Sequence, residues 1–491
     1  MGKINVEELK NLIEPHFHSE LGKDEYIVRK TKASKLLTHT RLDIAFKLLY
    51  LEMLEYDVNF SQELYREHIR AFSLGKFTEP GSDSKNSIDN YIEDFHNTFM
   101  DIKENGFDGN QTLIPLSKNA SIANGAHRVA SAIFLDKQVD CVALNSYDHM
   151  YDYKFFYQRN ITSSMLDIAA TTFVEYADNV HIAFIWPVAK SSWEDIGNII
   201  PNIVYQKEMR LNYNGAHNLL SQIYYGEEWL GNVENDFSGA KGKLVECFKT
   251  FDPVKIVAFQ AENLDEVLRV KKNVREVFNV GKHSIHITDT KEEAIRTARV
   301  VFNENSIHFL NYAKPNRYIS THKKIETFKD FIKDNGLDSK DVLLDSSITL
   351  SAYGLREAKD TDYLYSKSRK IKKKFIDIND HDEVLEYYDE EKNELVYNPK
   401  FHFYFNDIKF ISFSQLYKMK TSRGEEKDRN DCKVMEALIE NNRLKGMVNK
   451  FKQSIFYGQI ILRQKIIHLL QRIGLFDMAR VIYRKIKGNN G

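Results

Sequence analysis

Residues 345–364 read Asp-Ser-Ser-Ile-Thr-Leu-Ser-Ala-Tyr-Gly-Leu-Arg-Glu-Ala-Lys-Asp-Thr-Asp-Tyr-Leu, and they decide the fold expected for the C-terminal half of the chain. The stretch ends in two carboxylates, Asp360 and Asp362, spaced i, i+2. On a β-strand this spacing places both side chains on one face. Mg²⁺ usually takes one or two carboxylates together with substrate phosphates, so the pair predicts a metal site. The alternative is a solvated turn or helix cap, because acidic pairs are common on surfaces.

The order of features in this stretch resembles the nucleotidyltransferase fold of antitoxin-type and polymerase-β-like enzymes. Two hydroxyl residues are followed by an apolar helical segment, then by Gly354-Leu-Arg356 and the acidic pair. The resemblance covers about residues 341–431 and implies a metal-dependent transferase that acts on a phosphate or a nucleotide. The implied Mg²⁺ or Mn²⁺ ligands are Asp360 and Asp362, and the implied nucleotide-phosphate contacts are Ser346, Ser347 and Arg356.

The chain departs from that family's pattern at two points. The turn has Ser-Ser where the family usually has a glycine, and the third acidic ligand, expected on the next strand, is not obvious. In residues 401–411 the in-facing positions include His402 rather than an acid, and Asp407 falls in the hairpin turn. These departures count against full two-metal chemistry.

Basic residues follow this region. Residues 423–431, Arg-Gly-Glu-Glu-Lys-Asp-Arg-Asn-Asp, resemble the Lys-Asp-x-x-Asp segment that follows the sheet in several branches of the fold. Lysine and arginine bind phosphate through charge-assisted hydrogen bonds. We therefore expect Lys420, Arg423 or Lys427 to clamp phosphate.

Residues 88–142 form a second unit. A helix is expected over 92–103, a strand over 112–116, and a glycine turn into a helix within 121–135. This unit resembles the ParB/sulfiredoxin fold, whose signature is an Ile-Pro strand, a turn and Gly-x-His-Arg at a helix start. The resemblance implies that CTP or ATP phosphates bind at that helix start, where N–H groups and the helix dipole favour anions. The implied contacts are Asn124, Gly125, His127 and Arg128, the last two with catalytic roles; the alternative is an ordinary strand, turn and helix.

The middle region predicts alternating strands and helices. Strands are expected at 180–187, 255–259 and 284–288, with helices at 264–278 and 290–303. Such alternation suggests a mostly parallel sheet, in which ligands bind at the carboxyl ends of strands. A second site is therefore expected at Lys282, His286, Thr288 and Asp289; the alternative is a core histidine and a helix cap.

Length and composition indicate a multidomain globular chain. The 491 residues correspond to about three domains, and 42% hydrophobic and 28% charged residues are ordinary values. A net charge of −1 argues against a generally basic nucleic-acid binder, and three widely spaced cysteines favour a reducing compartment. The fold class expected is mixed α/β. The expected divisions are a helical segment 1–60, a ParB/sulfiredoxin-like domain 61–150, a middle α/β domain 151–320, a nucleotidyltransferase-like domain 321–435 and a basic amphipathic tail 436–491.

The tail is the most basic part of the chain. From residue 441 onward it has 11 Lys or Arg and one acid, Asp477. Apolar residues recur at helical spacing up to Gly474, and basic residues flank them. A basic amphipathic helix is typical of a membrane surface, so an anionic membrane is the partner expected for 446–488. The alternative is packing on the chain's own core or on a partner subunit.

Together these patterns predict a transferase of surface-polysaccharide synthesis. The N-terminus lacks the apolar segment of a signal peptide, so the expected location is the cytoplasm, at the inner face of the plasma membrane. ATP or CTP and Mg²⁺ or Mn²⁺ would be used to transfer a phosphate or nucleotidyl group to a sugar or lipid-linked glycan in capsule or lipopolysaccharide synthesis. The alternatives are modification of a protein or RNA, as in toxin–antitoxin nucleotidyltransferases, and a CTP- or ATP-gated binding protein without catalysis.

Overall fold

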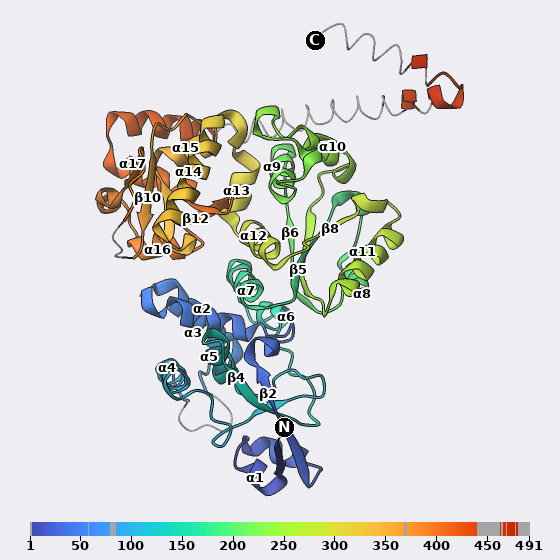
Figure 1. Ribbon diagram of the computed structural model, residues 1–491, viewed down its shortest axis with the longest axis vertical. Helices are drawn as coiled ribbons and strands as arrows, with labels where there is room; N and C mark the ends of the chain where they lie inside the picture. The colour runs from blue at the N-terminus through green and yellow to red at the C-terminus, as the bar shows by residue number, and fades with distance from the viewer. Residues whose placement is uncertain are drawn as a thin grey trace. The chain divides into compact units, whose positions relative to one another are not determined.

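The chain folds into a mixed α/β structure, here a computed structural model, that divides into two units, Met1–Gly424 and Glu425–Gly491 (Figure 1). The mixed α/β class expected from the sequence is confirmed. The structure describes residues 2–56, 58–78, 85–367, 371–438, 462, 465–467, 469–476 and 478–479. Within these residues, all three sheets belong to the first unit.

The first sheet has the strand order β1-β2-β4-β3. Its strands are β1 (Gly2–Asn5), β2 (Glu25–Lys32), β3 (Ile114–Leu116) and β4 (Gln138–Ala143). Two of these strands lie in residues 1–60, so the expectation of a purely helical N-terminal segment is wrong. The reason is long-range pairing: β2 pairs with β4 antiparallel across more than a hundred residues, beyond the reach of local periodicity.

Helices pack beside this sheet, and the pattern expected around the glycine turn is confirmed. Helix α4 ends at Gly106, as expected, and α5 starts after Gly125, whose φ of 88° favours glycine. The helices of this region are α1 (Val6–Lys10), α2 (Asp43–Met53), α3 (Asn59–Phe72), α4 (Ile88–Asn105), α5 (Ala126–Phe134), α6 (Tyr153–Tyr157) and α7 (Ser163–Tyr176).

The second sheet has the order β6-β7-β5-β8, and every pair in it is antiparallel. Its strands are β5 (Val180–Ile185), β6 (Ile203–Met209), β7 (Val254–Gln260) and β8 (Ile285–Ile287). The mostly parallel sheet expected here is therefore wrong. Continuous apolar runs are typical of parallel strands because both faces are buried, and here β5 and β7 are nearly fully buried in an antiparallel sheet.

Helices α8 (Trp193–Ile199) and α11 (Leu264–Phe278) cover one face of the second sheet through a shared apolar cluster (Figure 1). The bounds expected for α11 are confirmed. Thr290 caps α12 by accepting from Glu293 N at 3.1 Å, but α12 ends at Val301. The other helices of this region are α9 (Tyr213–Ile223), α10 (Ser238–Cys247), α12 (Lys291–Val301) and α13 (Glu304–Tyr312).

The third sheet has the order β11-β10-β9-β13-β12 and contains residues 345–364. β9 pairs antiparallel with β10 and parallel with β13, and β10 pairs parallel with β11. Its strands are β9 (Val342–Asp345), β10 (Thr361–Tyr365), β11 (Ile378–Asp380), β12 (His402–Phe405) and β13 (Ile408–Ile411). The accompanying helices are α14 (Ile319–Asn335), α15 (Ser347–Ala352), α16 (Lys392–Tyr397) and α17 (Phe413–Arg423).

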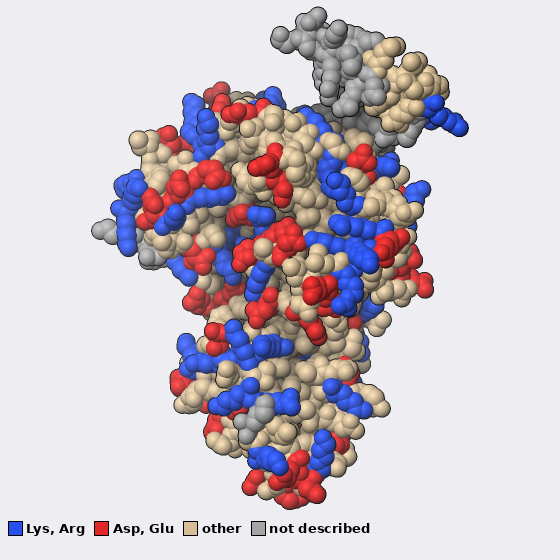
Figure 2. All heavy atoms as spheres, turned by 45° about the vertical axis from the view of Figure 1, so that its right-hand side comes forward, with Lys and Arg blue, Asp and Glu red and all other residues tan. Residues whose placement is uncertain are grey.

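The second unit contains the basic tail. The helix break expected at Gly474 is present, with φ 71° after helical residues 469–472. Most other expectations for 446–488 fall on residues outside those described. Among the described residues, no helix combines the length and apolar character needed to cross a membrane. Figure 2 shows basic and acidic side chains interspersed on the face that it presents, as expected for a net charge of −1.

Candidate functional site

The turn from β9 into α15 holds a residue in a strained conformation. Ser346 has φ 59° and ψ −127°, a region that favours glycine and costs another residue roughly 1–3 kcal/mol. This is the position where the resembled family usually has a glycine. Ser346 N donates to the carboxylate of Asp345 at 2.6 Å, which helps to hold the turn. Helix α15 has only six residues, so its end adds little to phosphate binding.

The two carboxylates of the Asp-x-Asp pair lie beside this turn. Ser347 Oγ donates to Asp360 Oδ1 at 3.0 Å, and Asp362 lies opposite Asp345 in the β9–β10 pair. Burial raises the pKa of Asp362, and the charges of Asp360 and Asp345 raise it further, while His381 opposes them. The structure thus brings together Ser346, Ser347, Asp360 and Asp362, which lie up to 16 residues apart in the sequence.

Asp345 is the buried centre of the cluster. Its side chain is fully buried. Its Oδ1 accepts from the Tyr388 hydroxyl at 2.6 Å as well as from Ser346 N, and its Oδ2 lies 3.0 Å from His381 Nδ1. Both oxygens are occupied, so Asp345 holds side chains of this chain rather than a ligand.

His381 and Tyr388 are functional candidates that the sequence interpretation missed. Burial lowers the pKa of His381, but the hydrogen bond and charge of Asp345 and the charge of Asp362 outweigh it, so the pKa is raised. Burial and Asp345 raise the pKa of Tyr388, so its hydroxyl stays a donor. The available signal was the polar run Asn379-Asp-His-Asp382 after a short β-prone segment.

β10 lies between β9 and β11, so residues 401–411 do not supply a strand next to it. In the β10–β11 pair Asp362 lies opposite Asn379, whose amide lowers the pKa of Asp362. An amide therefore stands where a third acid was sought. His402 is buried on the far edge strand, with Nδ1 3.4 Å from Leu395 O, and burial lowers its pKa well below the ordinary value.

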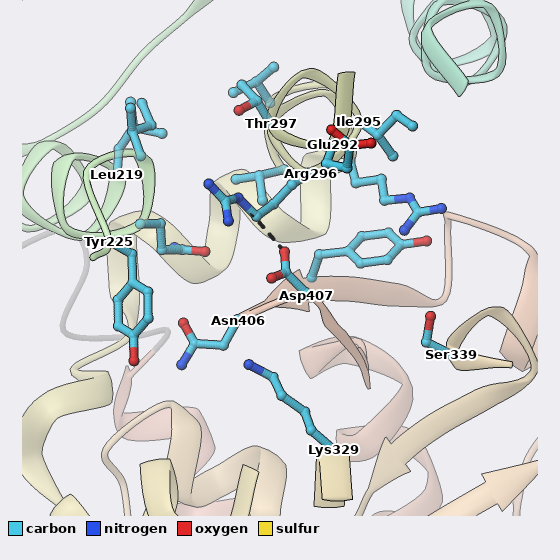
Figure 3. Close-up of a pocket in the computed structure, with 16 residues that line it drawn as sticks. Leu219, Tyr225, Glu292, Ile295, Arg296, Thr297, Lys329, Ser339, Asn406 and Asp407 are labelled. Carbon is cyan, nitrogen blue, oxygen red and sulfur yellow. Dashed lines mark ion pairs between the residues drawn. The ribbon is translucent and has the colours of Figure 1, made fainter. Parts of the chain in front are cut away.

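Asp407 lies instead at a separate pocket of about 400 Å³ (Figure 3). Arg296 and Asp407 reach toward one another there, with Nε and Oδ1 3.9 Å apart. Lys329 and Asn406 line the same pocket. Asp360, Asp362 and His381 are not part of its lining, so this pocket and the carboxylate cluster are different places.

The carboxylate pair fits a cation that is shared with a substrate. Within the part of the chain that the structure describes, no group of three or more His, Cys, Asp or Glu is placed to hold a metal ion. Asp360 and Asp362 supply two hard oxygen ligands, and their mutual charge raises the pKa of Asp362. A divalent ion held jointly with phosphates would relieve that repulsion, in keeping with the usual Mg²⁺ ligand set.

The basic residues expected at this site lie in different environments. Arg423 ends α17 and its charge acts on both His381 and Tyr388. Lys420 is buried within α17, and Arg356 is half-buried in the turn after α15. Lys427 belongs to the second unit, where its Nζ lies 3.1 Å from Glu425 Oε2. Among the basic residues expected to contact phosphate, Arg423 is thus one whose charge acts on residues of the cluster.

The Gly-x-His-Arg helix start has a structural arrangement. His127 is stacked on Phe95 with ring centroids 4.4 Å apart, and its Nε2 lies 2.9 Å from the Tyr65 hydroxyl. Burial lowers the pKa of His127 well below the ordinary value. Arg128 donates to Glu14 at 2.6 Å and to Thr112. These contacts favour packing over phosphate contact.

The preceding residue forms a local turn contact. Asn124 Oδ1 accepts from Gly125 N at 2.6 Å. This bond occupies the amide N–H of Gly125, one of the donors expected to face phosphate.

The second site expected in the middle region also has structural contacts. Thr288 is buried and its hydroxyl accepts from Ile182 N at 2.9 Å, which extends the sheet. His286 lies between Phe184 and Tyr224, with Nε2 3.3 Å from Glu293. Asp289 is exposed and pairs with Lys271 at 2.6 Å, and Lys282 is exposed. These contacts favour structural roles for His286, Thr288 and Asp289.

Comparison of the chain with protein-family models, with curated proteins and with solved structures finds no match.

Proposed function

We propose that the chain is a Mg²⁺- or Mn²⁺-dependent transferase that moves a phosphoryl or nucleotidyl group from ATP or CTP to a hydroxyl group. The carrying observation is the placement of Asp360 and Asp362 at the strained Ser346-Ser347 turn, with Ser347 bonded to Asp360. The acceptor class proposed is a sugar or a lipid-linked glycan of a surface polysaccharide.

The residues of the cluster have separate roles in this proposal. Asp360 and Asp362 would hold the cation, which when bound neutralises charge on the phosphate oxygens. Ser346 and Ser347 would contact phosphate from the turn, and Arg423 would add positive charge at its edge. Because Asp362 is mostly buried, its contact with the cation is shielded from water and strengthened.

The test is ³¹P NMR of the purified chain with Mg²⁺ and ATP, CTP or GTP, with water or glycerol as acceptor. We expect slow cleavage that the isosteric double variant Asp360→Asn/Asp362→Asn abolishes. The matched control is Asp330→Asn/Asp389→Asn, which removes two exposed carboxylates outside the site and should retain turnover. Cleavage that survives the site variant would contradict the proposal.

The acceptor class is tested separately. Transfer of label from α- or γ-³²P-nucleotide to lipid extract favours a glycan acceptor, whereas label on protein or RNA favours the toxin-type alternative. Nucleotide binding without turnover in any mixture would favour a gated binding protein instead.

We also propose that the tail contacts an anionic membrane. The described apolar residues Leu462, Ile466, Leu469 and Ile473 are all exposed, and exposed apolar side chains beside basic ones are typical of membrane-surface helices. Co-sedimentation with phosphatidylglycerol vesicles, but not with phosphatidylcholine vesicles, is expected. In the matched variant Lys465→Glu/Arg472→Glu, this preference for phosphatidylglycerol vesicles should be lost.

A further inference from the structure

The contact with Asp345 determines which ring nitrogen of His381 carries the proton. An ionised carboxylate has no proton to donate, so Asp345 can only accept from the ring. His381 Nδ1, 3.0 Å from Asp345 Oδ2, is therefore the donor. In the neutral imidazole the lone pair then lies on Nε2. The Tyr388 hydroxyl and Ser346 N hold the other Asp345 oxygen, which fixes the carboxylate that orients the ring.

The other ring nitrogen, Nε2, is not used by the contact with Asp345. None of the described residues hydrogen-bonds to His381 Nε2. The charges of Asp362 on β10 and Arg423 on α17 both act on the ring. The His381 ring is therefore oriented through Nδ1, and the charge of Asp362, one of the proposed metal pair, acts on it.

The carboxylates of the cluster have other roles in the proposed site. Asp345 already accepts hydrogen bonds from Ser346 N, His381 and Tyr388, and the position opposite Asp362 on β11 is the amide Asn379. Asp360 and Asp362 are assigned to the cation. A transfer to a hydroxyl group still needs a proton acceptor at the reacting oxygen, and a positioned histidine is the side chain most often used.

We propose, on the basis of the proposed function, that His381 is the general base of this site and that Asp345 and Tyr388 position it. His381 Nε2 takes the proton of the acceptor hydroxyl as the oxygen forms its bond to phosphorus. The bond from phosphorus to the leaving oxygen of the nucleotide breaks, and its electron pair leaves with the nucleoside diphosphate or the pyrophosphate. The proton on Nε2 then passes to solvent.

The test compares His381→Asn with His402→Asn in the full chain. The asparagine amide can still donate to Asp345 but lacks Nε2, and His402 is a buried histidine of the same sheet outside the site. We expect His381→Asn to lower turnover by about 10²- to 10⁴-fold. Binding of MgATP should change less than threefold, and added imidazole should restore part of the rate. An equal fall in both variants, or a loss of MgATP binding in His381→Asn, would overturn the assignment.

A second variant tests the positioning. Asp345→Asn can donate from its amide to Nδ1, which places the ring proton on Nε2 and removes the base without removing the ring. We expect the same fall in turnover without imidazole rescue. Full activity in Asp345→Asn would contradict the positioning role.

Failure of this inference is distinguishable from failure of the proposed function. If turnover is lost in Asp360→Asn/Asp362→Asn but retained in His381→Asn, the role of His381 as general base is overturned and the proposed function is not. If the wild-type chain shows no turnover, diethyl pyrocarbonate mapping gives the answer: His381 should be modified in EDTA and protected by MgATP. Modification that MgATP does not change would overturn the inference.

Discussion

Asp362 on β10 lies directly opposite Asp345 on β9, so two carboxylates face one another at the end of the third sheet. Like charges opposite one another destabilise an antiparallel pair. His381 and Tyr388 offset this destabilisation by hydrogen bonding to Asp345. The amide of Asn379 offsets it at Asp362, whose pKa it lowers.

Asp362→Asn is predicted to stabilise the protein without ligand. The neutral amide removes the repulsion that, with burial, raises the pKa of Asp362, so unfolding at pH 7 should cost about 1 kcal/mol more. Thermal melts in EDTA measure this, with Asp330→Asn as control. The gain should shrink as the pH falls through the raised pKa of Asp362, because the wild-type carboxyl then becomes neutral too. A destabilised variant at pH 7 would contradict the prediction.

Ser346→Gly is predicted to relieve backbone strain. Glycine adopts φ 59° without the steric penalty of a side chain, so a gain of about 1 kcal/mol in stability is expected. Ser351→Gly, near the C-terminal end of α15, should instead lose about 1 kcal/mol, because glycine is unfavourable in a helix and because the buried Ser351 hydroxyl, 2.6 Å from Thr321 Oγ1, is lost. The denaturant midpoints of both variants measure these changes in stability. A change of the same sign in both variants would contradict the prediction.

Gly354→Ala is predicted to disturb the turn before the acidic pair. Gly354 has φ 71°, and an added Cβ would lie 2.5 Å from Lys314 O, which is backbone and cannot move away easily. A loss of roughly 2 kcal/mol is expected from strain and displacement. Gly242→Ala, in α10 with open space around its Cβ, should gain about 1 kcal/mol. Thermal melts of the two variants provide the comparison.

Asp43→Asn is predicted to be strongly destabilising. Arg41 donates two bonds of 2.8 Å to Asp43, and Lys47 Nζ lies 3.3 Å from it, all three residues being buried. Removing the shared carboxylate leaves two buried cations without their partner, a loss of about 3–5 kcal/mol. Lys47→Met should destabilise the protein less, because it removes one buried cation and leaves Asp43 paired with Arg41. Equal midpoints for the two variants would refute this account.

Lys409 is predicted to make stability rise with pH. Burial lowers its pKa to about 7 from the ordinary 10.5, and its Nζ donates to Lys340 O and Val396 O. The unfolded chain therefore binds more protons between these two pH values, and stability increases as pH rises through that interval. The wild-type protein should gain roughly 2 kcal/mol relative to Lys409→Met between pH 7 and pH 9. Urea unfolding of both at the two pH values measures it; parallel behaviour would contradict it.

Local sequence determined the ends of helix α11. Asn263 caps α11 with its side chain, and Asn279 ends it in a left-handed conformation, so the bounds of this helix follow from neighbouring residues alone. The resemblance to the nucleotidyltransferase fold implied that Ser347 and Asp360 belong to one site, and Ser347 Oγ does donate to Asp360 Oδ1 at 3.0 Å.

Only the tertiary structure decided strand direction, strand neighbours and the partners of Asp345. Pairing of β5 with β7 and of β10 with β11 depends on how long connections return, which periodicity does not encode. His381 and Tyr388 are 36 and 43 residues from Asp345 and meet it because β11 and the following turn pack beside the end of β9. The sequence by itself therefore determined which residues carry charge and where a locally capped helix such as α11 begins and ends, whereas long-range pairing in the sheet decided which charges meet.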